Sequence, residues 1–147
     1  MTMTLEQVSE ILTGASLTVE TMKKELDGQV HEYIYITGSL VKIPVALSVN
    51  TEGSNPDIRM HTYVQLKETV TFEDAVMFAQ IVNSSLTFCK FYVVEENGEQ
   101  DKYMYGEYYL DIEHPVGDKL LIKSVIRLAS EFVLGFNEFD EDGDFTS

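Results

Sequence analysis

The chain has 147 residues, with 10 Lys and Arg against 25 Asp and Glu, so its formal charge is -15. This length suits one domain with a real core, and 44% hydrophobic residues exclude global disorder. The acidic excess disfavours nucleic acid and acidic membranes as partners, because both attract Lys and Arg, and no apolar run approaches the eighteen or so residues of a membrane-spanning helix.

A short amphipathic helix is predicted at the start of the chain. Thr4 and Gln7 form a capping box, apolar residues follow at helical spacing, and Gly14 is suited to the end of the helix. Residues 17–26 are ambiguous, since their apolar residues also fit one face of a helix. We favour a strand there, because Asp27-Gly28 is a typical hairpin turn between two strands.

Further strands are predicted before the middle of the chain. Residues 33–36 are aromatic and β-branched, and apolar residues alternate with others over 41–49 and 58–66. The last two segments predict an antiparallel hairpin. Pro44 cannot donate a hydrogen bond within a sheet, so we expect its strand at a sheet edge, or bulged there.

Two more helices are predicted. Thr71 is suited to cap a helix that ends near Leu86, and Asp118 is suited to cap a long helix that ends near Phe136. The first of these helices is apolar on most of its circumference, which is typical of burial on more than one side. A second copy of the chain, the terminal helix or another layer of the same chain could provide the second cover.

A strand pair is predicted between these helices, over 88–94 and 103–112, with Asn97-Gly98 at the turn. Runs of strands separated by helices, with hairpin turns and no strictly alternating strands and helices, predict an α+β fold. We therefore expect an antiparallel sheet with flanking helices.

A single domain over residues 1–137 is predicted, followed by a solvated acidic tail at residues 138–147. Within this tail, Glu138-x-Asp140-x-Asp142-Gly143 imitates the beginning of a calcium loop. The sequence ends before position twelve, where such a loop needs a bidentate Glu, so we favour the tail over a calcium site.

Residues with catalytic or metal-binding chemistry do not form a site motif. His31, His61 and His114 lie in separate predicted segments without the spacing of metal ligands. Cys89 alternates with apolar residues on one strand face and lacks a nucleophile signature. No glycine-rich phosphate loop occurs either. We therefore expect no enzyme, no cofactor and no metal site.

The expected location is cytoplasmic. Cys89 is the single cysteine, so it cannot form an internal disulfide. The first residues, MTMTLE, lack the basic and apolar blocks of a signal peptide.

The central helix supplies the first candidate surface for protein binding. Met77, Phe78 and Ile81 cannot all share the apolar stripe that faces the core. We expect these three residues to contact a second copy of the chain, unless the same chain covers them.

Tyrosines supply the second candidate surface. Tyr103, Tyr105 and Tyr109 share one face of a predicted strand with Glu107 and Asp111. Amphipathic rings edged by acids are of the kind enriched at protein interfaces. The alternative is cross-strand aromatic pairing that stabilises a half-exposed sheet.

The order of the predicted elements resembles the YbjN family. The resemblance covers roughly Leu5 to Phe136 and includes the central helix ending AQIVNSSL. YbjN-like sequences show an N-x-x-N motif after this helix; here Asn83 matches the first Asn and Leu86 occupies the second place. The family is similar in fold to the small, acidic, dimeric chaperones of type III secretion. The resemblance implies binding or chaperone-like regulation and no catalytic residues.

Three functions are compatible with these observations. We favour a non-enzymatic, acidic, chaperone-like regulatory protein that forms a homodimer and binds a protein or peptide client. The alternative is an inhibitor whose carboxylates imitate nucleic-acid phosphates in the basic groove of another protein. An enzyme with carboxylate chemistry has the least support, because no site motif is present.

Overall fold

The computed structural model describes residues 3–51, 55–96, 98, 101–113, 116–140 and 142–146. Helices and strands follow in the order α1 (Leu5–Gly14), β1 (Thr18–Leu26), β2 (Gln29–Thr37), β3 (Val45–Asn50), β4 (Asp57–Gln65), α2 (Phe72–Ser85), β5 (Lys90–Glu96), β6 (Asp101–Asp111) and α3 (Asp118–Phe139). The predicted α+β class is confirmed, and the ambiguous segment before Asp27 is a strand, as favoured. The capping box at Thr4 and Gln7 is also present.

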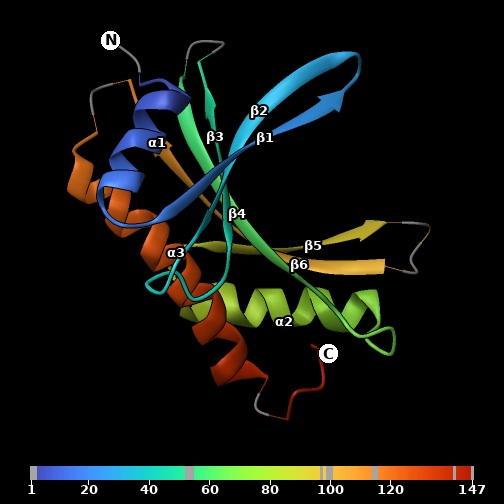
Figure 1. Ribbon diagram of the computed structural model, residues 1–147. Coiled ribbons are helices and arrows are strands. Elements are labelled where there is room, and N and C mark those ends of the chain that lie inside the picture. The colour runs from blue at the N-terminus through green and yellow to red at the C-terminus, as the bar shows by residue number, and fades with distance from the viewer. Residues whose placement is uncertain are drawn as a thin grey trace.

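One antiparallel sheet contains the six strands in the order β1-β2-β3-β4-β6-β5. β1 and β2 form a hairpin whose turn residues, Asp27 and Gly28, have φ of 52° and 77°. Two positive φ angles are typical of a type I′ turn. β2 pairs with β3 only over residues 34–36, so the rest of the hairpin extends beyond the sheet (Figure 1). We call this extension, residues 22–33, the arm.

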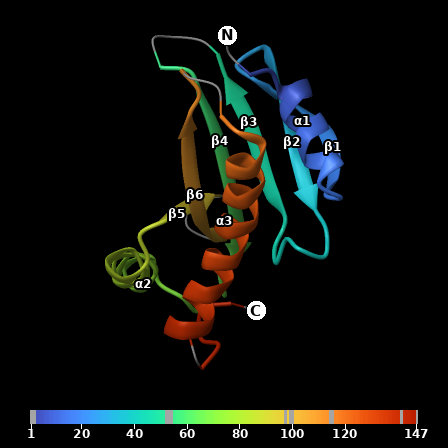
Figure 2. The ribbon, with the colours of Figure 1, turned by 90° about the vertical axis from the view of Figure 1, so that its left-hand side faces the viewer.

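The three helices pack on the same face of the sheet (Figure 2). Buried apolar residues of all three helices meet the inward side chains of the strands there. Phe132 of α3 stacks on Phe91 of β5 with ring centroids 5.0 Å apart. A Cβ at Gly106 of β6 would lie 2.4 Å from the Phe132 ring, so this glycine allows α3 to approach the sheet closely.

Two predictions, about the position of Pro44 in the sheet and about the N-cap of α3, are wrong. Pro44 precedes β3, which pairs with strands on both sides, so the proline is not in an edge strand. Its carbonyl instead accepts a hydrogen bond of 2.9 Å from the hydroxyl of Thr62. The N-cap of α3 is Gly117, and Asp118 is the first helical residue, where its charge still suits the positive end of the helix dipole.

The acidic C-terminal segment packs against the rest of the chain. α3 continues to Phe139, so the expected boundary after residue 137 falls inside the helix. Phe145 lies against Phe78 of α2 with ring centroids 4.7 Å apart, and its carbonyl accepts from the backbone N–H of Lys67 at 2.9 Å. The expectation of a solvated tail is therefore wrong around Phe145, because the ring of this residue packs against the fold.

Candidate functional site

The sheet face opposite the helices carries seven of the eight tyrosines of the chain. Side chains opposite each other on neighbouring antiparallel strands point to the same side, so the register defines this face. We call it the tyrosine face, and its main residues are Tyr33, Tyr35, Arg59, His61, Tyr63, Lys90, Tyr92, Tyr103, Tyr105, Glu107 and Tyr109.

A row of stacked rings crosses three strands of the tyrosine face. Tyr105 of β6 lies between Tyr92 of β5 and Tyr63 of β4, with centroid distances of 5.4 and 5.1 Å and interplanar angles of 21°. Tyr103 meets Tyr63 edge-on at 5.8 Å. Such offset and edge-on pairs stabilise one another, and the outward side of the row stays accessible: Tyr63 is 49% exposed.

The predicted shared face of Tyr103, Tyr105 and Tyr109 is confirmed by the register. Sequence reasoning missed Tyr63 and Tyr92, which belong to other strands. Their positions among the outward residues of two alternating segments are the signal that could have identified them.

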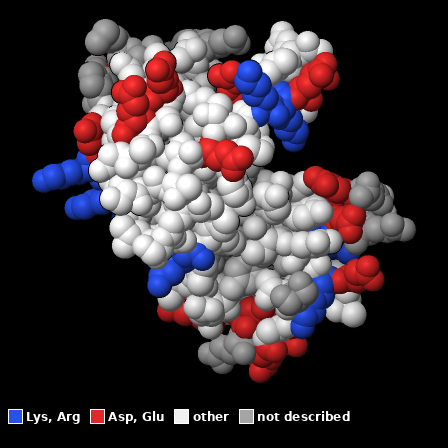
Figure 3. Space-filling model, in the orientation of Figure 1, with Lys and Arg blue, Asp and Glu red and all other residues white. Residues whose placement is uncertain are grey.

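The tyrosine face is hollowed. Figure 3 shows a notch in the outline of the molecule between the arm above and the β5–β6 pair below. Lys24 on the arm lies close enough to His61 of β4 to affect its pKa, although two strands separate β1 from β4. The arm therefore bends toward the centre of the tyrosine face.

Burial favours the neutral forms of His61, Tyr92 and Tyr105 on this face. The pKa of His61 is lowered mainly by burial and further by Lys24, against an opposing effect of Glu107. Burial raises the pKa of the Tyr92 phenol, and hydrogen bonding to Glu107 raises it further. The pKa of Tyr105 is raised in the same direction by burial and by neighbours that include Glu96. The shifts reinforce the protonated state that a phenol already has at neutral pH, so both hydroxyls can donate hydrogen bonds.

One cation, Arg59, contacts a ring of the tyrosine face. The guanidinium of Arg59 lies 5.4 Å from the centroid of the Tyr109 ring, while Asp57 accepts from it at 3.3 Å. This geometry is that of a cation–π contact. Other rings of the tyrosine face could accept a cation from a partner in the same way.

Phe78 does not belong to a surface, in contrast to the prediction for α2. It is 4% exposed and stacks on Phe136 of α3 with centroids 5.1 Å apart, so it is a core residue. Met77 and Ile81 are 59% and 50% exposed, so they remain candidates for contact with a second copy.

Other candidate residues have structural roles. Burial and the nearby Glu131 raise the pKa of the Cys89 thiol to about 12, so the thiol is protonated at neutral pH. Asp140, from the calcium-like motif, accepts from the backbone N–H of Asp144 at 2.8 Å and closes a turn. Where the structure describes the chain, no group of three or more His, Cys, Asp or Glu could hold a metal ion, and His114 lies outside the described residues.

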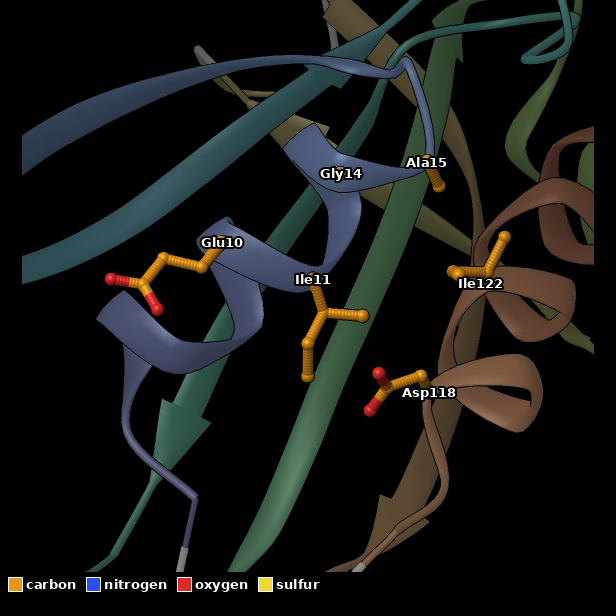
Figure 4. Close-up of a pocket in the computed structure, with 6 residues that line it drawn as sticks. All are labelled: Glu10, Ile11, Gly14, Ala15, Asp118 and Ile122. Carbon is orange, nitrogen blue, oxygen red and sulfur yellow. The ribbon is translucent and has the colours of Figure 1, made fainter.

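A shallow hollow of about 410 Å³ lies between α1 and α3 (Figure 4). It is lined by Glu10, Ile11, Gly14, Ala15, Asp118 and Ile122. Figure 4 shows the carboxylate of Glu10 turned away from the gap and from Asp118. The two acids therefore do not form a catalytic pair, and the tyrosine face is the stronger candidate.

Among the helices that the structure describes, none is both long enough and apolar enough to cross a membrane. No known family matches the sequence of the chain, and no curated protein does. The crystal structure of YbjN from E. coli, described as "a putative transcription regulator", is similar in fold, with a TM-score of 0.70 and 8% sequence identity. The alignment covers 97% of this chain and 96% of that one. The chain therefore has a YbjN-like fold, as the sequence resemblance implied.

Proposed function

We propose that the protein is a non-enzymatic binding module that holds an extended segment of another protein on the tyrosine face. The stacked row of Tyr92, Tyr105 and Tyr63 on a hollowed face without helices carries this proposal. Tyrosine suits an interface because its large ring loses little conformational entropy and its hydroxyl tolerates water before the partner binds.

The charges beside the row favour a partner with basic and apolar side chains. Glu96 and Asp101 lie opposite each other at the end of the β5–β6 pair, and both raise the pKa of Tyr103 after the larger effect of burial. Lys or Arg from a bound segment would reduce this excess of negative charge and contact ring faces. The total charge of -15 would also help to keep a client soluble.

A chaperone-like regulatory role is consistent with the description of YbjN as a regulator. A chain with this acidity is better suited to regulate through a basic protein partner than through direct contact with DNA. A cytoplasmic location and a homodimer are part of this proposal.

Selection from a linear peptide library tests the proposal. We expect wild-type protein to enrich peptides rich in Lys, Arg and apolar residues. A selected peptide should bind at least about tenfold more weakly to the Tyr63→Ala, Tyr105→Ala double variant. The control variant Met77→Ala, changed at an exposed residue of α2, should retain wild-type affinity.

Circular dichroism confirms that each variant is folded. Loss of affinity in Met77→Ala with none in the tyrosine variant would contradict the proposal, as would a library that yields no binder.

A further inference from the structure

The two edges of the sheet differ in how their outward backbone groups are occupied. At the β5 edge, the side-chain amide of Asn83 donates to the carbonyl of Phe91 at 2.9 Å and accepts from its N–H at 2.7 Å. This amide makes the two hydrogen bonds that a neighbouring strand would make with Phe91, and it attaches α2 to the edge of the sheet. A further strand therefore cannot pair with β5 at Phe91.

β1 forms the other edge of the sheet, where no strand of the described residues pairs with its outer side. Its turn defines which backbone groups face outward. In a two-residue hairpin turn, the carbonyl of Leu26 accepts from the N–H of Gln29, and bonded pairs then recur at every second residue. The even-numbered residues of β1 therefore bond to β2. Odd-numbered residues, from Val19 to Glu25, direct their N–H and C=O groups away from the sheet.

We propose that a second copy of the chain adds to this edge, with β1 antiparallel to β1 of its partner and with Met22 on the two-fold axis. Odd-numbered residues must face odd-numbered residues for the outward groups to bond. A register centred on Met22 fulfils this condition and pairs all nine residues of β1.

Charge selects this register over its neighbours. With Met22 at the centre, Glu20 faces Lys24 of the partner subunit, and the symmetric pair repeats the contact. A register centred on Lys23 would place two lysines opposite each other, and one centred on Thr21 forms no Glu–Lys pair. Opposite charges on facing residues favour strand pairing, and like charges oppose it.

The charge balance of β1 also permits self-association of an acidic chain. β1 contains Glu20 and Glu25 against Lys23 and Lys24, so its net charge is zero, whereas the whole chain carries -15. Two copies can therefore meet at this edge without bringing like charges together. The two-fold axis would be perpendicular to the sheet, so both tyrosine faces would lie on the same side of one continuous sheet.

Disulfide trapping tests the register directly. Met22 and Met22 of the partner subunit would form a non-hydrogen-bonded pair, whose Cα atoms lie about 4.5 Å apart, within the range for a disulfide. The native Cys89 is buried and does not compete. We expect Met22→Cys to form a disulfide-linked dimer under mild oxidation, and Met77→Cys on α2 to remain unlinked. Cross-linking of Met77→Cys without Met22→Cys would overturn the proposal.

Sedimentation of uncross-linked protein provides the second measurement. We expect the wild type to dimerise and Lys24→Glu to weaken the dimer at least about tenfold, since it places like charges opposite each other. The Glu20→Lys, Lys24→Glu double variant should restore the dimer, because it exchanges the charges of each pair. A wild type that is monomeric at every concentration would overturn this proposal and the homodimer of the proposed function. It would leave the binding of a segment on the tyrosine face intact, because a monomer can perform it.

Discussion

The two faces of the sheet use the same ring geometry with different aromatic residues. On the face covered by helices, Phe91 stacks on Phe132 at 5.0 Å, and both are fully buried. Its neighbour along β5, Tyr92, points to the other face and stacks on Tyr105 at 5.4 Å. The hydroxyl is the chemical difference, and it keeps a ring compatible with water. The phenylalanines stabilise the fold, whereas the tyrosines form a surface that a partner can cover.

Truncation of one ring on each face gives the largest expected effect and tests this comparison of the two faces. Phe132→Ala should lower the free energy of unfolding by about 3–5 kcal/mol, because it leaves a cavity in the core. Tyr105→Ala should lower it by less, about 1–3 kcal/mol, which is about 0.5–1.5 kcal/mol for each of its two stacked pairs. Urea unfolding measures both. Equal losses of unfolding free energy would contradict the view that the phenylalanines stabilise the fold while the tyrosines form a binding surface.

Asn83 tests how the covered side is attached to the edge of the sheet. Asn83→Ala removes both hydrogen bonds to the buried Phe91 backbone, so it should cost about 1–3 kcal/mol of unfolding free energy. Ser84→Ala, at the next and exposed residue of α2, is the matched control and should change stability by less than about 0.5 kcal/mol. Similar values for the two variants would show that the amide contributes little at this edge.

Phe145 tests whether the C-terminal segment belongs to the covered side. Phe145→Ala should lower the unfolding free energy by about 1–2 kcal/mol, because the ring is only partly buried against Phe78. Asp144→Ala serves as the control, with an expected change within about 0.5 kcal/mol. Thermal unfolding that does not distinguish these variants would restore the view of this segment as a solvated tail.

His61 gives the smallest effect and tests burial on the open face. Its folded pKa is lowered from 6.5, so below about pH 6.5 the unfolded chain binds a proton that the folded chain does not. Stability should therefore fall as the pH decreases from about 7.5 to about 5.5, by no more than about 1.4 kcal/mol per unit of pKa difference. His61→Gln should show a smaller fall in urea unfolding. A fall equal to that of the wild type would contradict the burial of this imidazole.

Strand alternation was sufficient to predict the outward tyrosines of β6, because side chains alternate between the faces of any strand. Alternation could not show that Tyr63 and Tyr92 lie beside the tyrosines of β6. β4 and β6 are neighbours in the sheet although α2 and β5 separate them in the sequence. Such pairing depends on tertiary structure, which a local pattern does not contain.

For helix α2, the sequence pattern did not predict which side faces the core. Its sequence is apolar on nearly every side, so spacing alone did not determine which residues face the core. Stacking of Phe78 on Phe136 orients the helix, and it leaves Phe72 exposed. The acidic composition of the C-terminal segment likewise predicted solvation, whereas the Phe145 ring and hydrogen bonds from Lys67 to Gly143 and Phe145 attach it to the fold.

Chemical-shift mapping with a library-selected peptide tests the central claim most directly. We predict that the peptide shifts the amide signals around Tyr63, Tyr92 and Tyr105 and leaves those of Phe78 and Phe132, on the helices of the covered face, largely unchanged. Shifts confined to α2 around Met77 and Ile81, with the tyrosine face unchanged, would contradict the claim that this face binds the partner.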